Sequence, residues 1–297
     1  MSNVIPFKSL FILLTLYSLT HGAEHEDFHG THGHHSHHSS KHKRIDFIDG
    51  AALFNKDVNE TGSLTDKVSG VHYYQELYGS FLYQVRDAAI RDNTKVKFLE
   101  IGLGCGSPFY GEGESIPIWK KVFTSPHAAA MNKTGDLIDL WISEIDKPCV
   151  DKARLKGILQ DTNMLIGDQG QVDHLKSWIQ ISGGNFTVIV DDGSHRSNHI
   201  ITSLSILWPN MAPGGLYFIE DVHVQRAWGE GYPIADIILS WIDQLLVRKG
   251  FYNFENKNIT PNQKHMREKF PVPKGLKWIF CQIESCVLAK CREGDFG

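Results

Sequence analysis

The sequence predicts an α/β protein with a doubly wound, mostly parallel sheet, and two observations carry this prediction. Short, continuous apolar runs alternate along the chain with helical patterns, as in repeated strand–helix units. Several runs also stop abruptly at acids or glycines, as Val188–Val190 does before Asp191 and Asp192. Buried parallel strands have such sequences, and their carboxyl ends form the edge at which open α/β folds bind ligands.

The composition suits one large domain. The chain has 297 residues, of which 41% are hydrophobic and 22% are charged, with a formal net charge of −4. This is enough apolar material for a sizeable core, and the sequence contains no basic stripe or recognition motif of nucleic-acid-binding proteins. We therefore expect no nucleic-acid partner. The sequence does not determine the oligomeric state, and a homo-oligomer is compatible with it.

The amino terminus has the pattern of a secretory signal. Lys8 precedes the apolar run SLFILLTLYS, which is short for a membrane span, and the small residues Gly22 and Ala23 fit a cleavage site. An uncleaved anchor or an ordinary apolar terminus is the alternative. We expect a lumenal or secreted protein without stable membrane insertion after cleavage, divided into a signal peptide (1–23), a spacer (24–44) and a folded domain (45–297).

The spacer contains eight histidines and almost no apolar residues, so we expect it to be disordered. It can bind Zn, Cu or Ni loosely through imidazole, although a solvated spacer is the simpler interpretation. The domain contains four N-x-[S/T] sequons that agree with a secretory route; they begin at Asn59, Asn132, Asn185 and Asn258.

The chain has five cysteines, an odd number that leaves at least one thiol free or paired between chains. Cys281 and Cys286 are five residues apart. They would face opposite sides of one straight strand, so we do not expect them to pair within such a strand.

The first half of the domain predicts a helix and then a strand with a glycine turn. Residues 45–70 are mixed and predict irregular structure with short helices, whereas residues 71–90 have apolar side chains at helical spacing. The strand Lys95–Ile101 contains Glu100 near its end. Gly102, Gly104 and Gly106 follow it and allow a tight turn with close backbone approach to a ligand.

The next two strands also end in polar residues. Leu137–Ile145 carries Glu144 near its end, followed by Asp146, and Met164–Ile166 is followed by Asp168 and Gln169. An acid after the second strand can accept hydrogen bonds from ribose hydroxyls. The alternative, a helix cap, applies more strongly to Asp146.

The fourth and fifth strands end in the densest acids. Thr187–Val190 precedes Asp191, Asp192 and His195, and Leu216–Ile219, after a turn at 213–215, precedes Glu220 and Asp221. Clustered carboxylates repel each other unless a cation or a proton joins them, and oxygen ligands suit Mg²⁺, Mn²⁺ or Ca²⁺. We therefore expect a divalent metal site. Neighbours on a strand face opposite ways, which leaves Asp191 for helix capping or a cofactor contact.

A transition-metal site is the rival interpretation. His195 and His199 are four residues apart and could share a helical face as a zinc pair, completed by Glu220 or His223.

Further along, residues 234–247 predict a helix and residues 251–276 a loop. Residues 278–283 and 286–288 predict a terminal hairpin. We expect four tryptophans in the core: Trp141, Trp178, Trp208 and Trp241.

These motifs together resemble a known family. FLEIGLGCG, SEID, IGDQ, VIVDDGSH and PGGLYFIEDVH, in this order and followed by a hairpin, are similar to class I S-adenosylmethionine-dependent methyltransferases. More narrowly they resemble the branch of macrolide-sugar O-methyltransferases and cephalosporin-hydroxylase-like proteins. The resemblance covers roughly residues 64–290 and includes the lead-in Leu64-Thr-Asp66-Lys67. It implies a seven-stranded sheet with a C-terminal β-hairpin.

The resemblance also implies roles for individual residues. S-adenosylmethionine would have its methionine part near Glu100 and the three glycines, its ribose at Glu144 and its adenine beside Asp168 and Gln169. Mg²⁺ or another divalent cation would be held by Asp192, Glu220 and Asp221, and His195 would be the general base. The sequence departs from the family in having Glu144 where Asp is usual. It also carries a secretory signal, although the cofactor is made in the cytosol.

The expected function is therefore Mg²⁺-dependent O-methylation of a small hydroxylated molecule, such as a sugar or a secondary metabolite. A metal can bind and acidify the alcohol, and a nearby histidine can take its proton. Two alternatives remain. One is a secreted, catalytically silent protein that binds a metal or ligand on the same fold, and the other is a metal-dependent hydroxylase or hydrolase.

Overall fold

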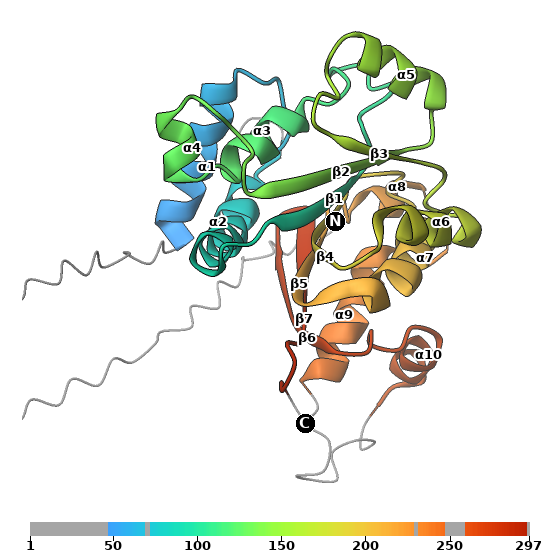
Figure 1. Ribbon diagram of the computed structural model, residues 1–297. Coiled ribbons are helices and arrows are strands. Elements are labelled where there is room, and N and C mark those ends of the chain that lie inside the picture. The colour runs from blue at the N-terminus through green and yellow to red at the C-terminus, as the bar shows by residue number, and fades with distance from the viewer. Residues whose placement is uncertain (1–46, 69–71, 229–230, 247–258, 296–297) are drawn as a thin grey trace, which may run out of the picture. The chain divides into compact units, whose positions relative to one another are not determined.

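A seven-stranded sheet organises the structure, a computed structural model that describes residues 47–68, 72–228, 231–246 and 259–295. The strand order is β3-β2-β1-β4-β5-β7-β6 (Figure 1). The strands β1 to β5 pair in parallel and β6 and β7 pair antiparallel, which confirms the predicted mostly parallel sheet with a terminal hairpin. The expected signal peptide, the histidine-rich spacer and the Asn258 sequon lie outside the described residues.

The strand bounds are close to those predicted. They are β1 Val96–Ile101, β2 Ile138–Glu144, β3 Asn163–Ile166, β4 Phe186–Asp191, β5 Met211–Ile219, β6 Leu276–Gln282 and β7 Ser285–Lys290. The expected turn at 213–215 is instead part of β5, where the register with β4 is irregular. Pro213 has no backbone N–H to donate to the regular hydrogen-bond ladder of a sheet, and glycines in strands often mark bulges. Pro213 and the two glycines that follow it therefore fit a strand at such an irregularity.

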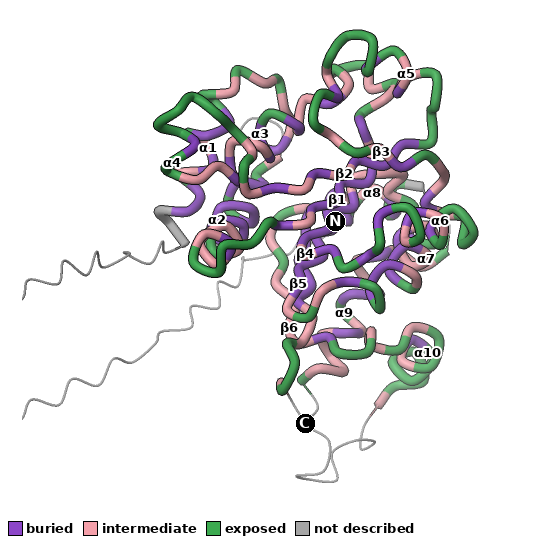
Figure 2. The backbone as a smooth tube through the Cα atoms, in the orientation of Figure 1, coloured by how far each residue is buried: buried purple, intermediate pink, exposed green. Residues whose placement is uncertain are grey.

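Helices cover both faces of the sheet. They are α1 Phe47–Thr61, α2 Gln75–Asp92, α3 Ser115–Val122, α4 Pro126–Ala130, α5 Lys147–Leu155, α6 Val172–Ser182, α7 Ser197–Leu207, α8 Val224–Trp228, α9 Ile234–Leu245 and α10 Pro261–Lys269. One apolar core joins α1, α2, α3 and α5 to the sheet, and a second joins α6, α7, α9 and α10 to its other face. The strands between them are largely buried (Figure 2), so their near-continuous apolar sequences are explained.

Two helices lie in segments for which the sequence predicts a different structure. Residues 47–61, expected to be irregular with short helices, form one helix. Gly50 of α1 and Gly79 of α2 let the two helices cross closely, since a Cβ at Gly50 would lie 2.3 Å from the Gly79 carbonyl oxygen. Within the expected loop 251–276, α10 begins at a capping box between Thr260 and Gln263, with Pro261 in its first turn.

Two disulfides cross-link the described chain. Cys281 and Cys286 are bonded across the β6–β7 hairpin, where they are direct partners on adjacent strands; the rule that excluded them within one strand did not apply. Cys105 is bonded to Cys149, and Cys291 has no partner among the described residues of the chain, in line with the odd count. Disulfides are typical of proteins that fold in an oxidising compartment.

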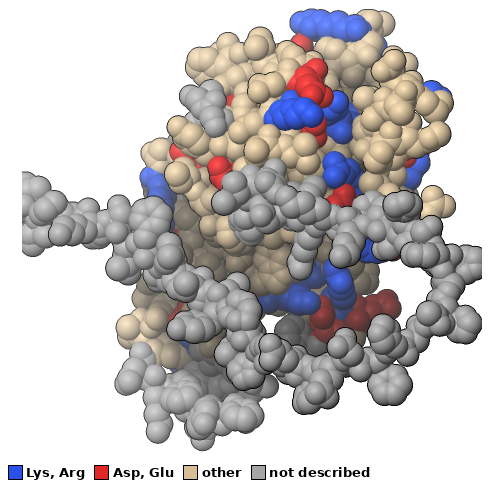
Figure 3. All heavy atoms as spheres, turned by 90° about the vertical axis from the view of Figure 1, so that its left-hand side faces the viewer, with Lys and Arg blue, Asp and Glu red and all other residues tan. Residues whose placement is uncertain are grey.

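The surface and core agree with the composition. On the face drawn in Figure 3, basic and acidic side chains are interspersed among uncharged ones, in keeping with the net charge of −4. Trp178, Trp208 and Trp241 are buried as expected, and Trp141 is half-buried against the core. No helix among the described residues combines the length and the apolar character needed to cross a membrane.

Candidate active site

A cavity of about 570 Å³ opens at the carboxyl ends of the parallel strands. Ten of the twelve residues predicted to form the site line it: Glu100, Gly102, Gly104, Gly106, Glu144, Asp168, Gln169, Asp192, His195 and Asp221. The other two, Asp191 and Glu220, lie behind the lining and are buried. The edge of the sheet therefore brings together residues that are far apart in the sequence.

The glycine turn packs directly against the acidic end of β4. Gly102 has φ +106°, and a Cβ there would lie 2.3 Å from the Asp192 carbonyl oxygen. The Gly102 N–H donates to Ser143 O (2.9 Å), and the Asp192 N–H donates to Ile101 O (3.1 Å). Only glycine fits this conformation and this close approach, so Gly102 holds the backbone at the floor of the cavity.

Glu144 connects the end of β2 to the glycine turn. Its Oε2 accepts a hydrogen bond from Leu103 N (3.1 Å), and its Oε1 accepts from the N–H groups of Ile145 (2.8 Å) and Asp146 (3.0 Å). The longer side chain of Glu, in place of the Asp that the resemblance implies, reaches the neighbouring loop. Asp146 caps α5 by accepting from Cys149 N (3.0 Å), which confirms the alternative weighed for it.

The disulfide Cys105–Cys149 fixes the same two loops covalently. Cys105 lies in the glycine turn and lines the cavity, and Cys149 lies in the first turn of α5, just after β2. The two loops predicted to hold the cofactor are thus tied together by one bond and by the hydrogen bonds of Glu144.

Asp191 belongs to a buried network beneath the cavity. Its carboxylate accepts hydrogen bonds from Gln169 Nε2 (2.9 Å) and Tyr217 OH (2.7 Å). Gln169 Oε1 accepts in turn from Ser194 N (2.7 Å). Burial raises the pKa of Asp191, although these two donors oppose the shift. In this structure Asp191 braces the loop after β4, as a residue facing away from Asp192 should.

A buried lysine occupies the centre of the acid cluster. Lys67 Nζ donates to Asp192 Oδ2 (2.8 Å) and to Glu220 Oε1 and Oε2 (2.9 and 2.8 Å), and it lies 3.8 Å from Glu100 Oε1. The side chains of Lys67 and Glu220 are 3% and 2% exposed. Tyr78 also donates its hydroxyl to Glu220. The cation that the clustered carboxylates require is thus supplied, at least in part, by the chain itself.

The cluster shifts the pKa values of its members. Although burial favours the neutral amine, the carboxylates of Asp192 and Glu220 hold the pKa of Lys67 well above 10.5. Burial and the charge of Asp192 raise the pKa of Glu220, despite the opposing effect of Lys67. Burial also raises the pKa of Glu100 to about 7. Although burial opposes it, the charges of Lys67 and His195 lower the pKa of Asp192, so Lys67 and Asp192 form the ionised pair of the cluster.

Glu100 lies on the opposite face of β1 from the adjacent residues Leu99 and Ile101. Its Oε2 accepts hydrogen bonds from Ser115 Oγ (2.5 Å) and Trp119 Nε1 (2.9 Å). These donors fix the carboxyl group beside Lys67 at the cavity wall.

Asp192, His195 and Asp221 face one another at the open side of the cluster. Each offers a ligand atom, and these atoms lie within 4.8 Å of one another. His195 Nε2 lies 3.6 Å from Asp221 Oδ2. The His195 backbone has φ +54°, a conformation that residues other than glycine rarely adopt. The local backbone thus turns His195 toward the acids. Such backbone outliers are found at functional sites.

The proposed zinc pair is not brought together in the same way. His199 Nδ1 lies 2.9 Å from Ser194 Oγ and 4.0 Å from Asp168 Oδ1. Of the potential metal-ligand groups found among the described residues, neither contains both His195 and His199.

Sequence reasoning assigned no role to Lys67, Tyr74 or Tyr78. Tyr74 OH donates to Asp221 Oδ1 (2.9 Å) and Tyr78 OH to Glu220, so both tyrosines hold the acids from the start of α2. The tyrosines belong to the helical apolar pattern of residues 71–90, and all three residues belong to the family lead-in, which assigns them no role in the site. The sequence does contain one signal for Lys67: it is a basic residue shortly before an apolar helix, in a chain whose predicted acid cluster needs a positive charge.

Comparisons with known proteins relate the chain to methyltransferases, although no family model matches it. It is 33% identical over 176 residues to mycinamicin VI 2''-O-methyltransferase of Micromonospora griseorubida and 32% identical over 176 residues to demethylmacrocin O-methyltransferase of Streptomyces fradiae. Each match covers 58% of this chain and 38% of the relative. The chain thus matches well under half the length of these relatives.

A solved structure supports the fold. The MycE methyltransferase of the mycinamycin biosynthetic pathway, in complex with Mg and SAH, superposes with a TM-score of 0.54 and 22% identity. The superposition covers 82% of this chain and 54% of that chain. The fold is therefore that of a Rossmann-like methyltransferase.

Proposed function

We propose that this chain, a relative of the S-adenosylmethionine-dependent macrolide-sugar O-methyltransferases, transfers a methyl group from S-adenosylmethionine to a hydroxyl group of a small glycoside or a similar metabolite. One observation carries the proposal. The glycine turn, Glu144 and the pair Asp192–His195 line a single cavity at the carboxyl edge of the sheet. Methyl transfer is an in-line displacement, and it requires that cofactor and acceptor be held side by side.

The cofactor would lie along the glycine turn. Glu100 and the glycines at 102, 104 and 106 would surround the methionine part, Glu144 the ribose, and Asp168 and Gln169 the adenine. Support comes from the cavity lining, which contains all of these residues, and from Gly102, whose close approach to the Asp192 carbonyl fixes the glycine turn at the floor of the cavity. Glu144 is already engaged with three backbone N–H groups, so a ribose would share its oxygens with the loop.

A divalent cation fits part of the expected ligand set. Asp192, Asp221 and His195 present atoms close enough to share one ion, and MycE was solved with Mg. Glu220, the third expected carboxylate, is bonded to Lys67 and Tyr78, so it would bind the ion only after Lys67 moved. When bound, Mg²⁺ would orient the acceptor hydroxyl and make it more acidic.

His195 would be the general base. It lines the cavity, and its Nε2 faces Asp221 Oδ2 at 3.6 Å, an arrangement in which the carboxylate stabilises the imidazolium that forms. The hydroxyl proton would pass to the imidazole as the acceptor oxygen attacks the methyl group.

One observation favours a second candidate, a catalytically silent ligand-binding protein on the same fold. Lys67 forms ion pairs with Asp192 and Glu220, so the chain itself neutralises part of the acid cluster. The two candidates are distinguished by incubating the full chain with S-adenosylmethionine labelled in its methyl group and a panel of hydroxylated glycosides. Label transfer that requires Mg²⁺ and stops with EDTA supports the methyltransferase. Cofactor binding without transfer to any acceptor class supports the silent protein.

The proposed cellular route is secretory. Of the four sequons, Asn59, Asn132 and Asn185 lie at exposed positions of the described residues, where an oligosaccharide could be attached. Together with the disulfides, this supports a lumenal or secreted glycoprotein with a cleaved signal peptide at residues 1–23.

Removing the disulfide between the two cofactor loops should weaken cofactor binding. In a variant with Cys105→Ser and Cys149→Ser, we expect a loss of about 2–4 kcal/mol in the free energy of unfolding, typical of a native disulfide. We also expect S-adenosylhomocysteine to bind roughly tenfold more weakly, or about 1.4 kcal/mol, because the glycine turn must be ordered on binding. Urea unfolding and calorimetry measure the two effects.

The matched control is Cys291→Ser, which removes the free thiol. It should leave both quantities unchanged. If the double variant and the control bind S-adenosylhomocysteine equally well, the disulfide does not shape the cofactor site.

A further inference from the structure

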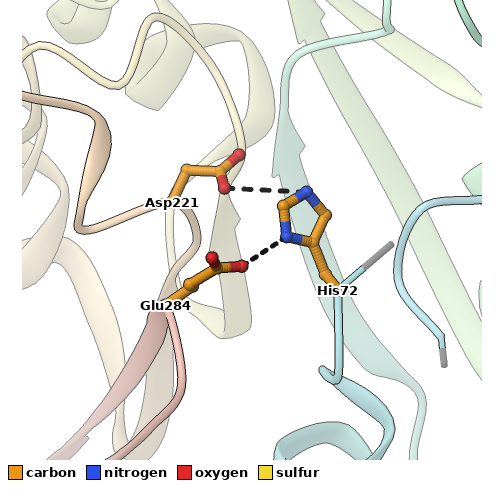
Figure 4. Close-up of side chains that lie close together, drawn as sticks. All are labelled: His72, Asp221 and Glu284. Atoms are coloured by element: carbon orange, nitrogen blue, oxygen red, sulfur yellow. Dashed lines mark hydrogen bonds and ion pairs between the residues drawn. The ribbon is translucent and has the colours of Figure 1, made fainter. Parts of the chain in front are cut away.

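A second group of metal-binding side chains lies beside the proposed active site. His72 precedes α2, Asp221 follows β5, and Glu284 lies in the tight turn between β6 and β7; Figure 4 shows the three side chains converging. His223, two residues after Asp221, lies at the same place. The group therefore joins three segments that are distant in sequence, and only Asp221 belongs to the set assigned to methyl transfer.

The distances suggest which atom of each residue would hold an ion. His72 Nδ1 lies 2.6 Å from Glu284 Oε2, so Nδ1–H is donated to that carboxylate. His72 Nε2 then faces Asp221 Oδ1 at 3.8 Å, and His223 Nδ1 lies 3.9 Å from the same oxygen. Donor atoms around a tetrahedral zinc ion are roughly 3.3 Å apart, as follows from metal–ligand distances of about 2.0 Å. Both imidazole nitrogens would have to move closer to Asp221 Oδ1, and His223, whose side chain is 48% exposed, would also have to rotate toward His72.

Hydrogen bonds hold the group in place without a metal. Tyr74 OH donates to Asp221 Oδ1 (2.9 Å), and the ring of Tyr74 stacks on His72 with 4.9 Å between centroids. The turn carrying Glu284 is attached to both other segments: Val222 N donates to Glu284 O (3.0 Å), and Gln282 Nε2 donates to Tyr73 O (2.6 Å). His72 and Asp221 are therefore held in place by their neighbours, as rigid metal sites require, whereas the His223 side chain is 48% exposed.

The hairpin turn carries a residue that turn geometry alone would not select. Glu284 has φ +63°, a left-handed conformation in which glycine or asparagine is favoured. The disulfide Cys281–Cys286 closes the strands on either side of this turn. A carboxylate in an unfavourable backbone conformation, held toward His72, indicates that its side chain has a role there.

We infer that this group, the rim site, binds a divalent transition metal ion such as Zn²⁺. The ligands are His72 Nε2, His223 Nδ1 and Asp221 Oδ1, and Glu284 orients His72 by accepting its Nδ1–H. A carboxylate that fixes the tautomer of a metal-bound histidine is a recurring feature of such sites. Two imidazoles and one carboxylate favour zinc or iron over Mg²⁺, which prefers oxygen ligands.

Asp221 would link the rim site to the active site. Its Oδ2 faces His195 (3.6 Å), and its Oδ1 faces His72 and His223. The inference goes beyond the proposed function, because the rim site can bind its ion whether or not methyl transfer occurs.

Anomalous diffraction from crystals of the full chain soaked in Zn²⁺ tests the inference. Because the spacer histidines also bind zinc, the position of the ion is the decisive readout. We expect a zinc peak in contact with His72 and Asp221. A peak at Asp192 and His195 without one at the rim site, or no peak among the described residues, overturns the inference.

A measurement in solution with matched variants completes the test. Competition with a chromophoric zinc chelator should show one fewer tightly bound Zn²⁺ ion in His72→Asn and in the more exposed His223→Asn than in the wild type. The control His127→Asn removes an exposed histidine of α4 and should bind as many ions as the wild type. Equal zinc stoichiometry in all four proteins contradicts the rim site.

Discussion

Replacing Lys67 with methionine should lower the free energy of unfolding by about 3–5 kcal/mol at neutral pH. This is the usual cost of removing one partner from a buried ion pair, because the remaining charge is left uncompensated. Lys67 is buried and contacts Asp192 and Glu220 at 2.8 Å, with Glu100 at 3.8 Å. Methionine has a similar length and fills the space without charge. Urea unfolding of the wild type and the variant measures the difference.

Lys121→Met is the matched control. Lys121 makes an ion pair with Glu60 at 2.6 Å, but both side chains are partly exposed, at 32% and 44%. Exposed pairs contribute about 0.2–1 kcal/mol, so this variant should be only slightly destabilised. Equal losses in the two variants would show that Lys67 is not the essential cation of the cluster.

The effect of Lys67→Met should also depend on pH. In the wild type, burial raises the pKa of Glu100 to about 7, above its ordinary 4.5, and Lys67 opposes this shift. Without Lys67, the pKa values of Glu100 and Glu220 should rise further. The folded state then binds protons that the unfolded state releases above pH 4.5. Stability of the variant should therefore increase as the pH is lowered from 8 toward 5.

Replacing His195 with asparagine should lower kcat by about 10²–10⁴-fold, the usual contribution of a general base. The Kd for S-adenosylhomocysteine should stay within about twofold of the wild-type value, because His195 lies beside Asp221 and the cofactor is proposed to lie along the glycine turn. Label transfer to an acceptor found in the glycoside panel measures kcat, and calorimetry measures the Kd.

The control His127→Asn should have wild-type kcat. Turnover retained in His195→Asn would remove His195 from the mechanism. A loss of activity that high Mg²⁺ restores would instead assign His195 to the metal as a ligand, because its ring lies within reach of the ion that Asp192 and Asp221 could hold.

The location of the site could be predicted from the sequence because parallel strands bring their carboxyl ends to one edge. Asp192 and Asp221 are neighbours for this reason, as are Gly102 and the end of β4. Each apolar run that ends in acids can be recognised locally in the sequence. The parallel sheet then places the ends of these runs next to one another.

The contents of the acid cluster could not be predicted in this way. Lys67 reaches Asp192 and Glu220 across 125 and 153 residues of sequence, and no local pattern reports such a contact. The expected metal set treated the three carboxylates as equivalent, whereas in the structure Glu220 is bonded to Lys67 and Tyr78. Glu284 was missed for the same reason: it reaches His72 from a turn 212 residues away.

The measurement that tests the central claim most directly is calorimetric titration of S-adenosylhomocysteine into the full chain, with Mg²⁺ and with EDTA. Gly102→Ala is the control, since its Cβ would lie 2.3 Å from the Asp192 carbonyl oxygen and displace the floor of the cavity. We predict micromolar binding by the wild type that is lost in Gly102→Ala. Absence of binding heat from a folded wild-type sample would contradict the assignment of this cavity to the cofactor and, with it, the proposed methyl transfer.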